Sequence, residues 1–224
     1  GLNINATTGV IDLAGSTPGT YTVTYAFGTA PCNGTTTSTV IVNAQPSATI
    51  SGGTFCATGT TTIAITGTTG GTFSSTAGLN INSTTGVIDL AGSTPGTYTV
   101  TYNYGTAPCT GSTTSQVTVS ANPTATVSGG TFCTTGSTTL TTTGATGGTF
   151  SASPAGLNIN AATGAINLAG SIPGTYTVTY AFGTAPCNGT TTSTVIVNAQ
   201  PSATISGGTF CATGTTTINI TGTT

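Results

Sequence analysis

The 224-residue sequence contains no lysine, arginine, histidine, methionine or tryptophan, and its only charged side chains are Asp12 and Asp89. Without histidine or lysine the chain has no ordinary general base, and no serine or cysteine has a basic neighbour that could activate it. Two carboxylates in different copies of a repeated motif cannot be expected to form an acid–base pair. We therefore predict that the chain is not an enzyme and carries no cofactor.

The missing cations also limit the partners. Duplex nucleic acids and anionic membrane surfaces are bound through lysine and arginine, which are absent. Calcium sites need six to eight oxygen ligands, more than one isolated aspartate can supply. No apolar run approaches the roughly 18 residues that indicate a membrane helix. We expect no nucleic-acid binding, no membrane insertion and no metal, and we expect any targeting signal to lie outside this stretch or to have been removed.

The chain is internally repeated. The run GLNINATTGVIDLAGSTPGTYTVTY begins at Gly1 and recurs with few changes at Gly78 and Gly156. Such a period, of about 77 residues, indicates a tandem array of one folded unit. We predict a partial unit at 1–45, complete units at 46–122 and 123–200, and the start of another at 201–224. Near-identical copies favour a role for length over a single chemical site.

Each unit has the pattern of short strands. In TYTVTY at 97–102, Tyr98, Val100 and Tyr102 alternate with threonines, as in a strand buried on one face. Glycine, proline, serine and asparagine separate such segments. For the second unit we predict strands at 48–51, 60–66, 71–74, 79–82, 87–90, 96–104 and 113–120. Seven strands in about 77 residues predict an all-β fold of tandem immunoglobulin-like β-sandwich repeats.

These residues also carry a resemblance. The run G-L-x-I-x-x-x-T-G-x-I-x-L-x-x-S-x-P-G-T-Y-T-V-T-Y, which starts at Gly78, resembles bacterial immunoglobulin-like repeats of the putative-Ig or cadherin-like kind. The segments GGTFCATGTTT and GTAPCNGTTTSTVIVN resemble repeats of giant cell-surface adhesins and filaments of gliding bacteria. The resemblance implies an extracellular, cell-surface stalk or adhesion module, but it specifies no ligand. The two aspartates are expected to be polar groups at turns or strand ends.

Six cysteines occur, two in each period. Their spacing lacks the close pairs and the histidines of metal sites, and an exported, repeated protein favours disulfides. The candidates are Cys32, Cys56, Cys109, Cys133, Cys187 and Cys211.

Strand order limits the disulfide pairing. Under the predicted order, Cys56 and Cys109 lie at opposite ends of one sandwich, about 20 Å apart, which exceeds the roughly 7 Å limit between the Cα atoms of a disulfide. The favoured pair is therefore Cys56 with Cys187, which would join neighbouring units. The alternatives left open are Cys56–Cys109 together with Cys133–Cys187, and the more closely spaced pairs such as Cys109–Cys133.

The preferred function is structural. We expect an extracellular, self-assembling filament or fibre of disulfide-linked, threonine-rich units, whose main partner is another copy of itself, because a nearly neutral chain tends to associate. Other cells or surfaces are further candidate partners. One alternative is a passive adhesin stalk that projects a binding domain located elsewhere. A remote alternative is an ice-binding repeat, suggested by the T-x-T pattern, although twisted sheets fit a flat ice face poorly.

Overall fold

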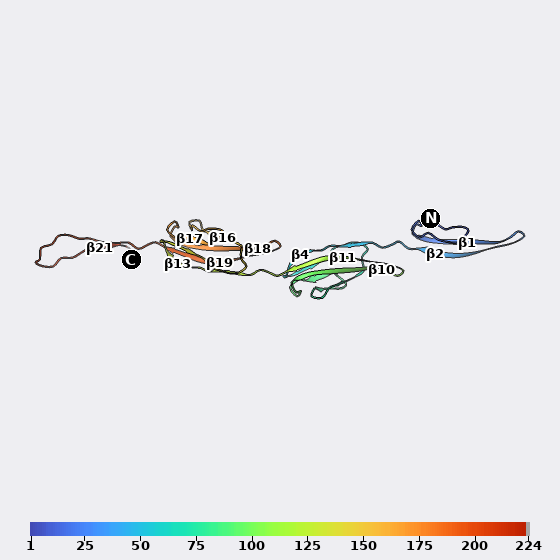
Figure 1. Ribbon diagram of the computed structural model, residues 1–224, viewed down its shortest axis with the longest axis horizontal. Helices are drawn as coiled ribbons and strands as arrows, with labels where there is room; N and C mark the ends of the chain where they lie inside the picture. The colour runs from blue at the N-terminus through green and yellow to red at the C-terminus, as the bar shows by residue number, and fades with distance from the viewer. Residues whose placement is uncertain (223–224) are drawn as a thin grey trace. The chain divides into compact units, whose positions relative to one another are not determined.

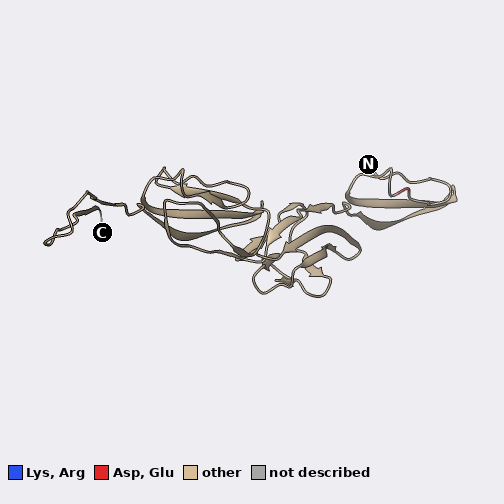
Figure 2. Cartoon of the chain, turned by 60° about the vertical axis from the view of Figure 1, so that its left-hand side comes forward, with Lys and Arg blue, Asp and Glu red and all other residues tan. Residues whose placement is uncertain are grey.

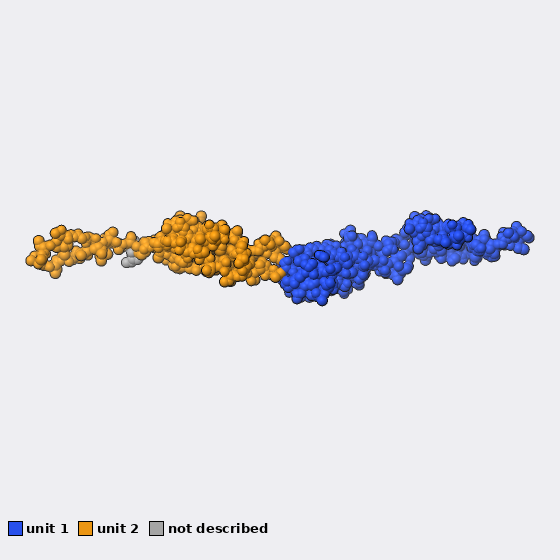
Figure 3. Space-filling view, in the orientation of Figure 1, with its two compact units in different colours: residues 1–120 blue, residues 121–224 orange. Residues whose placement is uncertain are grey.

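The computed structural model describes residues 1–222, which contain β-strands and no helix. The chain forms two compact units, Gly1–Ser120 and Ala121–Thr224 (Figure 3). The first unit contains two hairpins of long strands, the second unit contains one, and both units contain several short strands (Figure 1). The all-β sandwich class that the sequence predicts is therefore confirmed, and each unit is described separately below.

Eleven strands make up the first unit. They are β1 (Gly19–Thr29), β2 (Cys32–Val42), β3 (Ala48–Ile50), β4 (Gly53–Cys56), β5 (Thr60–Thr62), β6 (Ile65–Gly67), β7 (Thr72–Ser75), β8 (Asn80–Ile81), β9 (Val87–Asp89), β10 (Gly96–Thr106) and β11 (Cys109–Ser120). The larger sheet has the order β4-β11-β10-β7, while β5-β9-β8 and β3-β6 form two smaller sheets. Each of these sheets contributes apolar side chains to one core.

The core of the first unit follows from the alternation in the sequence. Tyr98, Val100 and Tyr102 of β10 are buried, whereas the threonines between them are exposed or only partly buried. Across the core they meet Ile63 and Ile88 from the segments of the smaller sheets. Fully burying one such side chain contributes roughly 1.5–3 kcal/mol. The strict period of two thus places buried side chains on one face of the β10–β11 hairpin, the main hairpin of this unit, and solvent-exposed side chains on the other face.

The strand β4 pairs in parallel with the end of β11, and its register places Cys56 opposite Ser120. At the other end of the hairpin, the Pro46 ring lies near Gly105, where an added Cβ would come within 2.9 Å of the proline Cγ. The complete sandwich of the first unit consists of β3 to β11. The chain therefore enters this sandwich at the tip of the β10–β11 hairpin and leaves it at the far end of β11.

Some predicted boundaries need correction. The sequence predicts no strand at 53–56, but this segment forms β4, because its backbone pairs with the distant β11. The single strand predicted at 60–66 is broken into β5 and β6. The break falls at Ala64, whose N–H donates to Ser51 Oγ at 2.8 Å. The last predicted strand, 113–120, begins earlier than expected, at Cys109.

The hairpin β1–β2 has the same sequence pattern but a different environment. Tyr25 and Phe27 are 65% and 49% exposed, whereas their counterparts Tyr102 and Tyr104 are 1% and 9% exposed. In the complete sandwich these rings are covered by β7 and the smaller sheets. Within residues 1–45 no equivalent layer lies over Tyr25 and Phe27, because β1 and β2 form a two-stranded sheet, and both rings are exposed.

The second unit repeats the arrangement. Its strands are β12 (Ala125–Val127), β13 (Gly130–Cys133), β14 (Ser137–Thr139), β15 (Thr142–Gly144), β16 (Thr149–Ser153), β17 (Ala165–Asn167), β18 (Gly174–Thr184), β19 (Cys187–Asn198), β20 (Ala203–Ile205) and β21 (Ile220–Gly222). The main sheet has the order β13-β19-β18-β16, which corresponds strand for strand to that of the first unit. Its parallel ladder places Cys133 opposite Asn198. The predicted boundaries of the repeats and their length remain predictions.

Candidate functional site: cysteines, hydroxyl surfaces and a polar pocket

The surface carries almost no charge (Figure 2). Asp89 is used locally: one carboxylate oxygen accepts from Gly92 N–H at 3.0 Å and the other from Asn80 Nδ2 at 3.1 Å. In the second unit Asn167 replaces it and accepts from Gly170 N–H at 3.2 Å. These hydrogen bonds confirm the expected role of the aspartates at turns. Asn167 makes the same turn with an uncharged amide, so the turn does not depend on charge.

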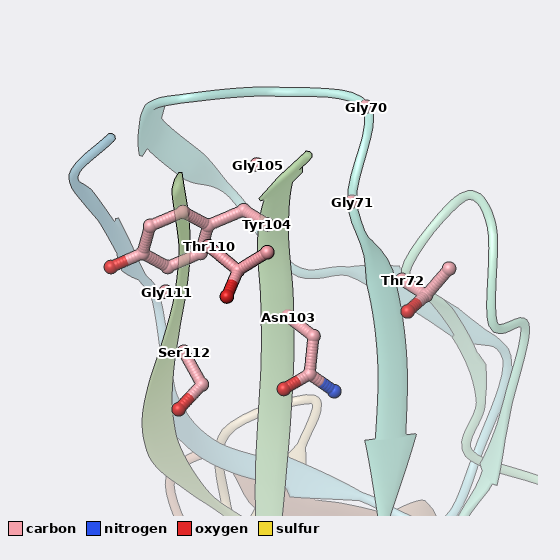
Figure 4. Close-up of a pocket in the computed structure, with 9 residues that line it drawn as sticks. All are labelled: Gly70, Gly71, Thr72, Asn103, Tyr104, Gly105, Thr110, Gly111 and Ser112. Carbon is pink, nitrogen blue, oxygen red and sulfur yellow. The ribbon is translucent and has the colours of Figure 1, made fainter. Parts of the chain in front are cut away.

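A shallow pocket lies at the tip of the main hairpin of the first unit (Figure 4). The residues that line it come from β7, β10, β11 and the loops beside them: Gly70, Gly71, Thr72, Asn103, Tyr104, Gly105, Thr110, Gly111 and Ser112. Its polar groups are hydroxyls, an amide and the backbone, so it offers no carboxylate, imidazole or amine for proton transfer at neutral pH. At the corresponding positions of the second unit, Ala181 and Phe182 replace Asn103 and Tyr104. The pocket's chemistry is therefore not shared by the two units.

Glycine allows the strands at this pocket to approach closely. A Cβ on Gly71 would lie 2.0 Å from the carbonyl oxygen of Asn103. Gly71 N–H donates to the phenol oxygen of Tyr102 at 2.9 Å, and that phenol donates to Thr68 O at 3.2 Å. The buried tyrosine thus ties the loop before β7 to the main hairpin, which is a structural role. The alternation of residues in the sequence does not predict this contact, although the paired glycines before T-F signal it.

A second tyrosine forms a clasp at the start of the main hairpin. The Tyr98 hydroxyl donates to the carbonyl oxygen of Thr94, four residues upstream, and the hydroxyl oxygen lies 2.6 Å from Thr94 Oγ1. In the second unit Tyr176 donates to the carbonyl oxygen of Ile172. A tyrosine near the start of such a strand that bonds back to the upstream backbone is the tyrosine corner of immunoglobulin-like sandwiches. The repeated P-G-T-Y motif is the signal for it.

The exposed face of the main hairpin carries hydroxyl and amide side chains: Thr97, Thr99, Thr101, Asn103, Ser112, Thr114, Gln116 and Thr118. Thr97 Oγ1 and Thr118 Oγ1 are 3.0 Å apart, so neighbouring strands share hydrogen bonds across this face. This neutral face can donate and accept hydrogen bonds but cannot attract or repel ions.

The cysteines divide into two groups. Cys56 and Cys187 are disulfide-bonded. Cys32, Cys133 and Cys211 are exposed free thiols, and Cys109 is a partly buried free thiol. The alternatives that require Cys109 or Cys133 in a disulfide are therefore not formed. The favoured pairing of Cys56 with Cys187 remains a prediction.

Register explains why the pairs Cys56–Cys109 and Cys133–Cys187 are not formed. Cys56 lies beside Ser120, the last residue of β11, whereas Cys109 is the first residue of the same strand. At about 3.3 Å per residue their separation is about 36 Å, far beyond the roughly 7 Å allowed between the Cα atoms of a disulfide. In the second unit, Cys133 lies beside Asn198 and Cys187 begins β19, so the same separation applies.

Within residues 1–222, no three histidine, cysteine, aspartate or glutamate side chains gather as a metal site would require. Over the same described range there is no helix long and apolar enough to cross a membrane.

No protein-family model matches the chain, and no curated protein matches it. Solved structures do show likeness. Extracellular domains 3–5 of Drosophila OTK are 11% identical, with a TM-score of 0.43, and the match covers 89% of this chain and 78% of that one. Domains EC1-3 of the mouse clustered protocadherin PcdhgC3 are also 11% identical, with a TM-score of 0.35 and coverages of 89% and 85%.

A third similar structure is a SusE-like surface polysaccharide-binding protein from Bacteroides thetaiotaomicron. It is 15% identical, with a TM-score of 0.31, and the match covers 88% of this chain and 41% of that one. At these scores the comparisons support no functional argument.

Proposed function

We propose that the chain is the repeat region of an extracellular filament or fibre, in which tandem immunoglobulin-like units are joined by a disulfide between Cys56 and Cys187. The observation that carries the proposal is the oxidation of these two cysteines while the other four remain thiols. The units serve as a scaffold, and no site of chemical turnover is needed.

The chemistry of the bond supports this role. Forming it removes two protons and two electrons from the thiols of Cys56 and Cys187, and an oxidised disulfide carrier of the export compartment would accept them and become a dithiol. Such bonds form and persist in oxidising, extracellular environments. The expectation of a cell-surface or extracellular location follows from the same argument.

The surface supports self-association. With a formal net charge of −2 over 224 residues, copies of the chain repel one another weakly. Threonine faces such as that of Thr97 and Thr118 offer hydrogen-bonding groups on neighbouring strands. A second copy of the chain is the partner that matches this neutral surface, and contacts with other cells or surfaces would be secondary.

Electron microscopy of the purified, unreduced chain tests the proposal. We expect fibres with lateral order and an axial spacing that matches one unit. Isolated beaded threads would instead indicate the stalk of an adhesin, whose binding domain lies elsewhere, and would overturn the filament proposal. Thermal hysteresis measured on the same sample tests the ice-binding alternative, which predicts a measurable effect.

A further inference from the structure

The disulfide of the proposed function has a mechanical consequence. The chain between Cys56 and Cys187 includes β5 to β18 and therefore most of both sandwiches. Tension applied at the chain ends would reach Cys56 through the backbone, cross the sulfur–sulfur bond and continue at Cys187. We propose that the chain is a length-limited tether in which this bond carries load past the folded sandwiches. This inference rests on the pairing given under the proposed function.

The length of chain that the Cys56–Cys187 bond would enclose is large. A stretched chain spans at most about 3.6 Å per residue, so the roughly 130 enclosed residues would otherwise add about 470 Å when the sandwiches unfold. The two Cα atoms of a disulfide lie only about 6 Å apart. The bond therefore removes more than half of the extension available to the whole chain, and it does so covalently, whatever the stability of the sandwiches.

Two segments that remain under tension have little slack. The segment 32–56 connects two cysteines outside the enclosed loop, and β2, β3 and β4 account for most of it. Strand residues already rise by about 3.3 Å each, close to the limit of a stretched chain. The segment 187–211 has the same spacing of cysteines and begins with β19. These two segments thus begin near their full length.

This arrangement differs from a string of independent sandwiches. In such a string each domain lengthens several-fold when it unfolds, so the array absorbs force by extension. Here unfolding inside the enclosed loop would leave the end-to-end distance almost unchanged. The chemical class of regulator is correspondingly narrow: a thiol reductant, which returns two electrons and two protons to the two sulfurs, would convert the tether to an extensible chain.

Single-molecule force spectroscopy of the complete chain tests the inference, with handles ligated to the termini through chemistry that spares thiols. The oxidised chain is expected to reach a fully stretched length of about 340 Å, and the double variant Cys56→Ser, Cys187→Ser about 800 Å. The fully stretched length is read from the unfolded chain, so the result does not depend on how well the variant folds. Equal lengths for the two proteins would overturn the inference.

The matched control is Cys109→Ser, Cys133→Ser, which removes two thiols that are free in the structure. It should keep the short stretched length, and a long one would assign the load-bearing bond to these residues and overturn the proposal. Failure of the tether is distinguishable from failure of the filament. Ordered fibres with equal stretched lengths would remove the tether and the Cys56–Cys187 bond but leave the filament, whereas a short stretched length without fibres would remove only the filament.

Discussion

Cys56 lies directly opposite Ser120 in the parallel ladder between β4 and β11, and therefore at the far end of β11 from Cys109. One sandwich thus holds its two cysteines a full strand length apart. This relationship prevents each unit from closing its own disulfide and leaves both sulfurs available to other parts of the structure.

Disulfide mapping should find Cys56 linked to Cys187. The chain has no lysine or arginine, so trypsin cannot fragment it, and digestion after tyrosine, phenylalanine and leucine is the suitable choice. Mass spectrometry of the unreduced digest should give one cross-linked peptide pair that disappears on reduction. A peptide in which Cys56 is joined to Cys109, or Cys109 to Cys133, would contradict the assignment.

Removing the bond should lower stability. Replacing Cys187 with serine opens a closed loop of roughly 130 residues, and chain entropy assigns a loop of that size about 4–5 kcal/mol. We expect the midpoint of denaturant unfolding to fall, and the wild-type chain to fall equally when reduced. Cys32→Ser removes an exposed free thiol and is the control that should leave the midpoint in place.

The tyrosine clasp predicts a local effect. Tyr98→Phe deletes the phenol that donates to the carbonyl oxygen of Thr94 in a largely buried position. We expect a loss of about 1–2 kcal/mol in the free energy of unfolding of the first unit, since a hydrogen bond is lost and its acceptor loses that partner. Tyr25→Phe alters a ring that is 65% exposed and should change the free energy by less than about 0.5 kcal/mol.

The core predicts a larger effect. Ile88 has no exposed surface and packs between the two layers of the first unit. Ile88→Ala should cost about 2–5 kcal/mol through lost burial and the cavity left behind. Ile41→Ala, at a position 62% exposed, is the matched control. Thermal unfolding of the two variants should separate them clearly, and equal effects would contradict the assignment of the core.

The four free thiols should form disulfides between copies of the chain. Cys133 and Cys211 occupy the position of Cys56 in the repeated sequence, and Cys32 and Cys109 that of Cys187. Mild oxidation at high protein concentration should therefore give covalent oligomers on a non-reducing gel. The double variant Cys133→Ser, Cys211→Ser should remain monomeric on this gel. Its remaining free thiols, Cys32 and Cys109, both occupy the position of Cys187 in the repeat, so no free thiol at the position of Cys56 is left to pair with them. Oligomers that persist in this variant would show that the pairing is unselective.

The sequence predicts the main hairpin well, because alternation such as Tyr98, Val100 and Tyr102 directly reports a strand with one buried face. It predicts β4 poorly. The segment G-T-F-C is short and glycine-rich, and its partner β11 lies far along the chain, so no local pattern identifies the pairing. The break at Ala64 likewise depends on a hydrogen bond to Ser51. The Tyr98 clasp was not predicted, although the P-G-T-Y motif is its signal, because alternation indicates only that the ring is buried and not that its hydroxyl donates to a backbone carbonyl.

The position of Pro46 beside the hairpin tip, with β11 ending at the opposite end of the sandwich, has a consequence for how such a chain can change over generations. Because a unit receives the backbone at one end and passes it on at the other, adding or deleting a copy does not reverse the path of the chain. Near-identical copies are also the substrate for unequal recombination in the coding DNA. Length can therefore be inherited as a variable trait while every remaining sandwich keeps its own geometry.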